Sequence, residues 1–201
     1  MVTESSSDTQ KFDHLFKLVR SERFLKKQGI GNEVPFFICP YLPEQDVQMK
    51  KLVSQLKNKL KENGIEVLHL DLYDLVIELL THRGILGSVI TKEPSLTKKQ
   101  LLDLLQSVCD SKDHIIPAIA KKMEAQAFDV MFLTGVGEVY PYIRSHNVLN
   151  NLQSTAKEKP TVLFFPGSYT HSDEGGASLN LFGRLHDDKY YRAFNIYKCE
   201  I

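Results

Sequence analysis

The chain has 201 residues, of which 42% are hydrophobic and 25% are charged, and its 25 basic residues balance its 25 acidic residues. A chain of this length can bury enough surface for one ordinary core, so we expect a single domain over residues 1–201. The zero net charge excludes bulk attraction to nucleic acid or to an anionic membrane surface, and a near-neutral surface favours an obligate partner.

The sequence carries no signal for a membrane or for export. No apolar run approaches the roughly 18 residues of a membrane span, and the polar start, MVTESSSDTQ, lacks the apolar centre of a signal peptide. Cys39, Cys109 and Cys199 lie far apart without metal-ligand spacing, which predicts small buried hydrophobes. We therefore expect a cytoplasmic protein whose residues 1–8 form a disordered lead.

The first part of the chain predicts a helix, a strand, a second helix and a second strand. The opening helix follows a cap at Asp8 or Thr9, and the apolar run 34–41, bounded by prolines, predicts a buried strand. The next helix ends at Gly64, and residues 65–70 predict a strand that the crossover allows to pair in parallel with the first. The apolar stripe of that helix consists of Met49, Leu52, Val53, Leu56 and Leu60.

Helical patterns fill the middle of the chain. Asp71 is the expected cap of a helix that Gly84 and Gly87 break. Residues 88–127 have helical periodicity throughout, with a capping box that begins at Thr97, and we expect them to form a helical excursion from the domain.

The stretch 128–152 has the order strand, glycine loop, helix. An apolar run leads to Gly135 and Gly137, and Pro141 is expected to open an amphipathic helix. Ligands of open α/β sheets collect beyond the carboxyl ends of strands, so this stretch is the best place for a site.

The glycine loop admits two interpretations. Gly135 and Gly137, with Arg144 one helical turn into the next element, can form a nest that binds an anion. A dinucleotide fingerprint is incomplete, however, because Tyr140 occupies the position of its third glycine. The alternative is a tight turn from strand to helix in which Tyr140 and Tyr142 pack on their neighbours.

The last part of the chain predicts a strand over 159–166, an exposed loop over 167–176 and a final strand over 190–201. These elements together indicate an α/β fold, a three-layer sandwich with a mostly parallel sheet of about five strands. The expected strand order is compatible with a degenerate nucleotide-hydrolase core, an analogy at the level of the fold alone.

No catalytic or metal motif is complete. A phosphate loop needs GxxxxGK[ST], whereas PYLPEQD follows the first strand. Ser168 lacks the GxSxG elbow, although His171 and Asp173 lie in the same loop, and His69 and Asp71 alternate on a strand without a recognised ligand spacing. We therefore expect a protein that is not an enzyme, with no catalytic residues, no metal and no cofactor.

Three segments in the last third of the chain carry a specific resemblance: LTGVGEVYPYIRSHNVLNNLQ, KPTVLFFPGSY and SLNLFGRLHDDKYYRAFNI. Together they resemble the BrxB family, the small B component of BREX bacteriophage-defence systems. The resemblance implies a bacterial cytoplasmic protein that acts beside a separate methyltransferase, an ATPase and the alkaline-phosphatase-like PglZ protein. It also implies a physical association with PglZ and with other BREX proteins.

Two classes of function follow. The first is a non-catalytic adaptor or scaffold that binds PglZ in support of phage exclusion and host DNA methylation. The second is a phosphate-, nucleotide- or DNA-binding module or enzyme that uses Gly135, Gly137 and Arg144; we expect direct DNA binding to be weak or absent. For the adaptor, the candidate partner-binding residues are aromatic and arginine anchors, namely Tyr140, Tyr142, Arg144, Tyr169 and Arg184.

Overall fold

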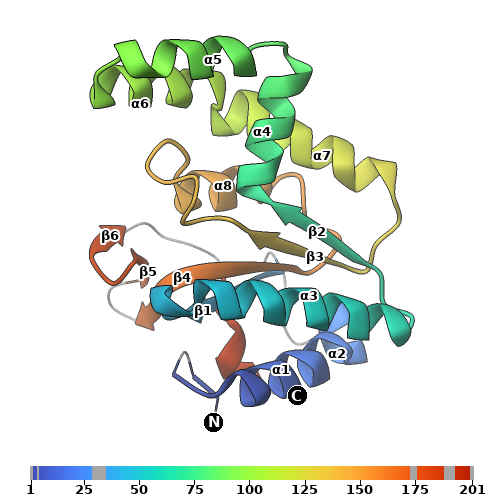
Figure 1. Cartoon of the computed structure of the whole chain (residues 1–201). Helices are drawn as coiled ribbons and strands as arrows, with labels where there is room; N and C mark the ends of the chain where they lie inside the picture. Colours follow the sequence, from blue (N-terminus) through green and yellow to red (C-terminus); the bar gives the residue numbers. More distant parts are fainter. Residues whose placement is uncertain (1, 4, 29–34, 173–175, 188–192, 200–201) are drawn as a thin grey trace.

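A parallel sheet forms the centre of the molecule (Figure 1). The structure, a computed structural model, describes residues 2–3, 5–28, 35–172, 176–187 and 193–199. Five of its strands lie side by side in the order β2–β3–β4–β1–β7, and each neighbouring pair is parallel. The strands are β1 (Phe36–Tyr41), β2 (Val67–Asp71), β3 (Val130–Thr134), β4 (Thr161–Ser172), β5 (Gly176–Leu181), β6 (Leu185–Asp187) and β7 (Phe194–Asn195).

Helices cover both faces of this sheet, which confirms the predicted three-layer α/β fold. Figure 1 shows α1 and α3 on one side and α4, α7 and α8 on the other. Because both faces are covered, β1 and β3 are buried along their whole lengths and read as continuous apolar runs. The helices are α1 (Asp8–Val19), α2 (Glu22–Leu25), α3 (Asp46–Glu62), α4 (Leu72–His82), α5 (Leu86–Lys92), α6 (Lys98–Val108), α7 (Ile116–Ala125) and α8 (Ser145–Leu152).

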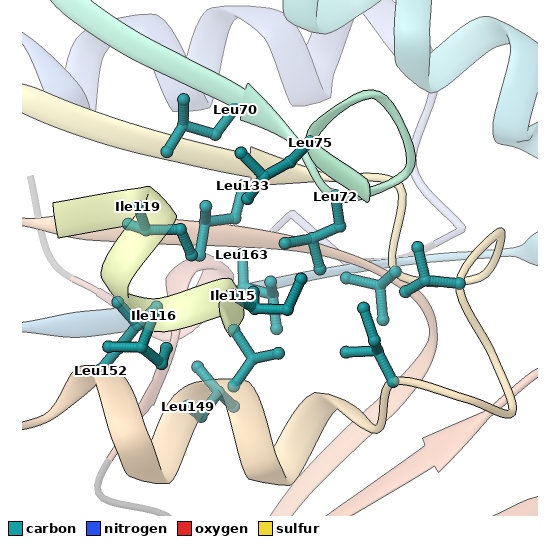
Figure 2. Packing of buried hydrophobic residues seen from close by; sticks show 14 of the residues in the cluster. Leu70, Leu72, Leu75, Ile115, Ile116, Ile119, Leu133, Leu149, Leu152 and Leu163 are labelled. Carbon is teal, nitrogen blue, oxygen red and sulfur yellow. The ribbon is translucent and has the colours of Figure 1, made fainter. Parts of the chain in front are cut away.

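Two hydrophobic clusters hold the layers together. On the α3 side, the predicted stripe is buried against Phe132 and Phe164, whose rings meet edge to face with centroids 5.3 Å apart. On the other side, leucine and isoleucine side chains of α4, α7 and α8 meet those of the sheet (Figure 2). Ile115, Ile119 and Leu152 are fully buried there. No described helix is long and apolar enough to cross a membrane.

Short-range signals placed most helix ends correctly. Asp71 caps α4 by accepting hydrogen bonds from two backbone amides, and Thr97 forms the predicted capping box of α6. The start of α1 differs, because Ser7, rather than Asp8 or Thr9, is its capping residue. Gly87 does not break a helix but lies inside α5.

The segment 88–127 divides into parts with different burial. In Figure 1, α5 and α6 lie at the top of the molecule, farther from the sheet than α4 and α7. Neither α5 nor α6 has a buried residue, whereas α7 buries Ile116 and Ile119 in the core. Short 3₁₀ and π turns connect these helices, at Glu93–Ser95 and Ser111–Ile115.

The predicted pairing of the first two strands is wrong. β1 and β2 are parallel members of the same sheet, but β4 and β3 lie between them. The helix after the glycine loop begins at Ser145 and not at Pro141, whose peptide bond with Tyr140 is cis. Arg144 therefore stands at the N-cap of α8, not one turn inside it, and its side chain makes no capping hydrogen bond.

The predicted exposed loop 167–176 is wrong, because β4 continues to Ser172 and pairs with β5 as an antiparallel hairpin. A side chain at residue 167 would place a Cβ only 2.1 Å from the backbone oxygen of Asn180, so the close crossing requires glycine there. The predicted strand 190–201 contains only β7 and a 3₁₀ turn, Ile196–Lys198, within the described residues.

Candidate functional site

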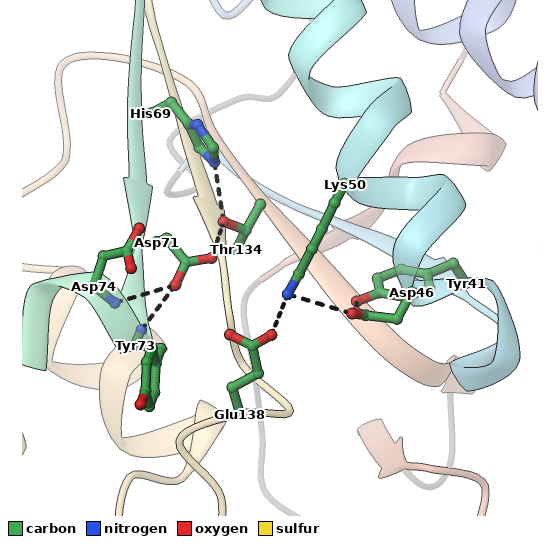
Figure 3. Close-up of polar contacts among 9 residues, drawn as sticks. All are labelled: Tyr41, Asp46, Lys50, His69, Asp71, Tyr73, Asp74, Thr134 and Glu138. Carbon is green, nitrogen blue, oxygen red and sulfur yellow. Dashed lines mark hydrogen bonds and ion pairs between the residues drawn. The ribbon is translucent and has the colours of Figure 1, made fainter.

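The carboxyl ends of β1, β2 and β3 meet at one edge of the sheet. The chain leaves β1 through α3 on one face and leaves β3 toward α8 on the opposite face. In α/β proteins such a divergence opens a crevice in which ligands bind. Charged and hydroxyl side chains fill this place, and Figure 3 shows them as two groups.

The first group links β2 to β3 through hydroxyl, carboxylate and imidazole. The Thr134 hydroxyl donates to Asp71 Oδ2 at 2.8 Å, and His69 Nε2 lies 3.0 Å from the same hydroxyl oxygen (Figure 3). Since the hydroxyl has a single proton and gives it to Asp71, His69 donates through Nε2. His69 is therefore not placed as a base toward Thr134.

The environment of His69 disfavours the charged form of its imidazole. Burial lowers the pKa of the His69 imidazole from its ordinary value of 6.5, and the positive charge of Lys57 lowers it further. The carboxylates of Asp71 and Asp74 act in the opposite direction but are the smaller influences. A neutral imidazole fits its role as a hydrogen-bond donor to a threonine hydroxyl.

The second group bridges the loop after β3 and the start of α3. Lys50 pairs with Glu138, and its Nζ lies 3.5 Å from Asp46 Oδ2 (Figure 3). The hydrogen bond with Glu138 raises the pKa of Lys50, and the charge of Asp46 adds to this. The Tyr41 hydroxyl donates to Asp46 Oδ1 at 2.7 Å, and burial followed by this bond raises the pKa of Tyr41. Side chains of β1, of α3 and of the loop after β3 thus join at this edge of the sheet.

A carboxylate accepts from the amides at the start of α4, and a second carboxylate lies in the first turn of α3. Asp46 is the first residue of α3, and Asp71 accepts from the amides of Tyr73 and Asp74 at the start of α4, at 2.9 and 3.3 Å. Helix N-termini favour one negative group, and here that group belongs to the chain. Pro43 also removes a backbone donor from the turn after β1. The electrostatics of this edge therefore disfavour a phosphate.

The two glycines of the loop allow close packing. Gly135 has φ +76°, and a Cβ there would lie 2.5 Å from Asp71 Oδ1. A Cβ at Gly137 would lie 3.0 Å from the ring of Phe182. Gly135 thus faces a carboxylate, and neither glycine is among the residues that line the pocket containing Arg144.

A second concave feature lies between the start of α8 and the β5–β6 hairpin. It is a pocket of about 210 Å³ that brings together three of the predicted partner-binding residues, Tyr140, Arg144 and Arg184. We call it the arginine pocket. Its remaining lining residues are Ser145, Phe165, Leu179, Leu181 and Leu185.

The other two predicted partner-binding residues lie elsewhere. Tyr142 is half-buried against the core, and burial raises the pKa of its hydroxyl to about 12. Tyr169 is only 3% exposed, its hydroxyl donates to the Ala193 carbonyl at 2.6 Å, and burial raises its pKa to about 12. Neither lines the arginine pocket.

The remaining candidates do not assemble into a catalytic or metal site. Within the part of the chain that the structure describes, no cluster of three or more histidine, cysteine or acidic side chains is placed to hold a metal ion. Ser168 lies on β4 opposite Asn180, and Asp173 lies outside the described residues. Cys39 and Cys109 are buried as predicted, and Cys199 is half-buried.

Several residues at the carboxyl edge were not singled out from the sequence. Thr134 and Glu138 come from the end of β3 and the loop after it, Asp46 and Lys50 come from α3, and only the order of the strands brings them together. The available signal was the position of Thr134 and Glu138, which lie at and just after the end of an apolar run that forms a strand.

Comparison with known proteins identifies the family. The family model described as "BREX protein BrxB" matches residues 68–196. A BREX protein BrxB of Bacillus cereus (strain H3081.97) is 31% identical over 93% of this chain and 96% of its own length. Another of Escherichia coli O9:H4 (strain HS) is 29% identical over 89% of this chain and 86% of its own length. No solved structure matches the chain significantly. The chain therefore belongs to the BrxB family, whose members are components of BREX phage-defence systems.

Proposed function

We propose that the protein is a non-catalytic adaptor of a BREX system that binds the alkaline-phosphatase-like PglZ component. Membership of a multi-component defence system supplies other components of the same system as partners. PglZ is the partner that we infer within that set.

The observation that carries the proposal is the state of the carboxyl edge. Enzymes of α/β fold keep their chemistry in the crevice at this edge. Here Lys50 of α3 pairs with Glu138 of the loop after β3, and Asp46 and Asp71 occupy the starts of the two helices that face it. Carboxylates lie at this edge where a phosphate-binding loop would present backbone amides, which supports a structural role for the edge.

A surface suited to binding another protein lies away from this edge, at the arginine pocket. Interface hot spots are rich in tyrosine and arginine, and these side chains become desolvated near the centre of the interface. Tyr140, Arg144 and Arg184 share one pocket with a floor of buried apolar side chains. The pairing of arginine with an apolar floor favours protein recognition over the anion-binding function considered as the alternative.

Co-expression of the full chain with PglZ of the same system, followed by size-exclusion chromatography, tests the proposal. We expect one co-eluting complex at micromolar concentration, and separate elution would contradict an adaptor role. A thermal-shift panel of nucleotides and inorganic phosphate tests the alternative. A ligand at 100 times its Kd stabilises a fold by about 2.7 kcal/mol. A rise in Tm with any nucleotide would therefore count against a non-catalytic adaptor.

A further inference from the structure

The arginine pocket has a charged rim and an apolar floor. Phe165, Leu179 and Leu181 form the floor and are 0%, 2% and 6% exposed. Arg144 and Arg184 are both exposed at the rim. An occupant that matches this surface carries a negative group beside an apolar one.

The side chains of the two arginines lack counter-charges among the described residues. Neither guanidinium makes a hydrogen bond or an ion pair with another residue that the structure describes. Guanidinium groups pair with carboxylates through two parallel hydrogen bonds, and they lose little hydration energy when they do so. Two unpaired positive groups at one opening therefore favour an acidic occupant.

The volume limits the size of that occupant. Small-molecule and cofactor pockets have volumes of about 300–1,000 Å³, whereas the arginine pocket measures about 210 Å³. This space suits one large apolar side chain better than a nucleotide. The apolar floor agrees, since burial of such a side chain contributes about 1.5–3 kcal/mol.

The turn that carries Arg184 is held in an unusual conformation. Phe182 has φ +55°, which is rare for an aromatic residue, and strained backbone of this kind concentrates at functional positions. Its ring meets Tyr140 edge to face at 6.3 Å between centroids and lies against Gly137. These contacts fix the β5–β6 turn beside the pocket before any partner arrives, which lowers the entropy lost on binding.

We propose that the arginine pocket binds an acidic peptide segment of the protein partner. One bulky apolar side chain of that segment enters the pocket, and flanking carboxylates pair with Arg144 and Arg184. The inference rests on the adaptor function and specifies its docking chemistry. Phosphate groups of DNA are the competing source of negative charge, but the chain has zero net charge and the pocket floor is apolar.

Model peptides test the pocket without the partner. The probes are blocked tripeptides of sequence Asp-Phe-Asp, Asn-Phe-Asn and Asp-Ala-Asp, titrated into the full chain while the arginine Nε–H signals are followed by NMR. We expect Asp-Phe-Asp to shift the signals of Arg144 and Arg184 at millimolar concentration, and each of the other peptides to bind at least about 10-fold more weakly. Equal binding of the three peptides, or no shift with any, would overturn the proposal.

The complex with PglZ tests the same pocket at full affinity. Arg144→Glu combined with Arg184→Glu reverses both charges, and the matched control combines Lys98→Glu with Lys99→Glu, two exposed positions on α6 with the same change in net charge. We expect unchanged melting temperatures in both variants, since neither arginine side chain bonds to another residue in the described part of the chain. The arginine variant should weaken binding at least about 100-fold, and the control should bind like the wild type.

The outcomes separate the two proposals. If the wild type binds PglZ and the arginine variant binds it equally well, the pocket assignment is wrong and the adaptor role stands. If the wild type does not bind PglZ while Asp-Phe-Asp still selects the pocket, the choice of partner is wrong and the pocket assignment stands. If a short DNA duplex binds in a salt-sensitive way and the arginine variant loses this binding, the pocket binds nucleic acid and the peptide proposal is wrong.

Discussion

Replacement of Thr134 by valine tests whether the carboxyl edge of the sheet is held by its polar contacts. Thr134 is 6% exposed and lies at the end of β3, and valine has nearly the same shape and suits a strand equally well. The change removes the hydrogen bond to Asp71 and the one that joins Thr134 to His69. It therefore isolates the hydroxyl from the packing of the side chain.

The expected loss follows from what the hydroxyl leaves behind. Hydrogen bonds to charged groups contribute about 1.5–3 kcal/mol, and a buried polar group without a partner costs about 1–3 kcal/mol. Asp71 keeps its contacts with the amides at the start of α4 through Oδ1. The groups left without a hydrogen bond are Asp71 Oδ2 and His69 Nε2. We expect Thr134→Val to destabilise the fold by about 3 kcal/mol and to lower Tm by roughly 6–12 °C.

Thr134→Ser is the matched control, since it keeps the hydroxyl and loses one methyl group, which costs about 1 kcal/mol. Urea unfolding and thermal denaturation of the three proteins give the comparison. Valine should be less stable than serine by about 2 kcal/mol. A valine variant as stable as the serine variant would mean that water satisfies Asp71 and His69, and the reasoning would fail.

Two further predictions concern glycine and pH. Gly167→Ala should lower stability by at least about 2 kcal/mol in urea unfolding, because its Cβ would meet backbone across the hairpin. Gly87→Ala, in the first turn of α5 where a Cβ would meet no atom within 4 Å, should instead raise stability by about 0.5–1 kcal/mol; equal effects at the two positions would contradict the structure. The folded-state pKa of His69 lies below 6.5, so the unfolded chain binds the proton more readily and stability falls as pH drops through 6.5. His69→Gln should reduce that fall between pH 7 and pH 5, and identical pH profiles would exclude a contribution from His69.

Sequence patterns over a few neighbouring residues predicted the elements that depend on short-range interactions. The stripe of α3, the cap at Asp71 and the capping box at Thr97 depend on residues within a few positions of one another, and each is confirmed. The hairpin of β4 and β5 was missed because Gly, Ser, Thr and His side chains after Pro166 are typical of a loop. Only pairing with a later segment makes this stretch a strand.

At the candidate site, too, the residue types were predictable from the sequence, whereas their arrangement depends on contacts between distant segments. The sequence predicted Tyr140, Arg144 and Arg184 as separate anchors, and the structure places all three around one pocket. Tyr169 looked equivalent in the sequence, but the hairpin turns it inward to Ala193. The contacts at the carboxyl edge depend on the strand order, in which β4 separates β1 from β3, and no local pattern encodes that order.

The continuity of β4 connects the arginine pocket to the central sheet. The first half of this strand pairs with β1 and β3 inside the sheet, and its second half pairs with β5. Phe165 on the pocket floor therefore belongs to a strand held from both sides, while Arg184 rides on the hairpin that extends from it. A partner bound there would therefore restrain a strand of the core as well as the hairpin. Native-state hydrogen exchange should accordingly show that binding slows exchange along β4 as well as in the hairpin.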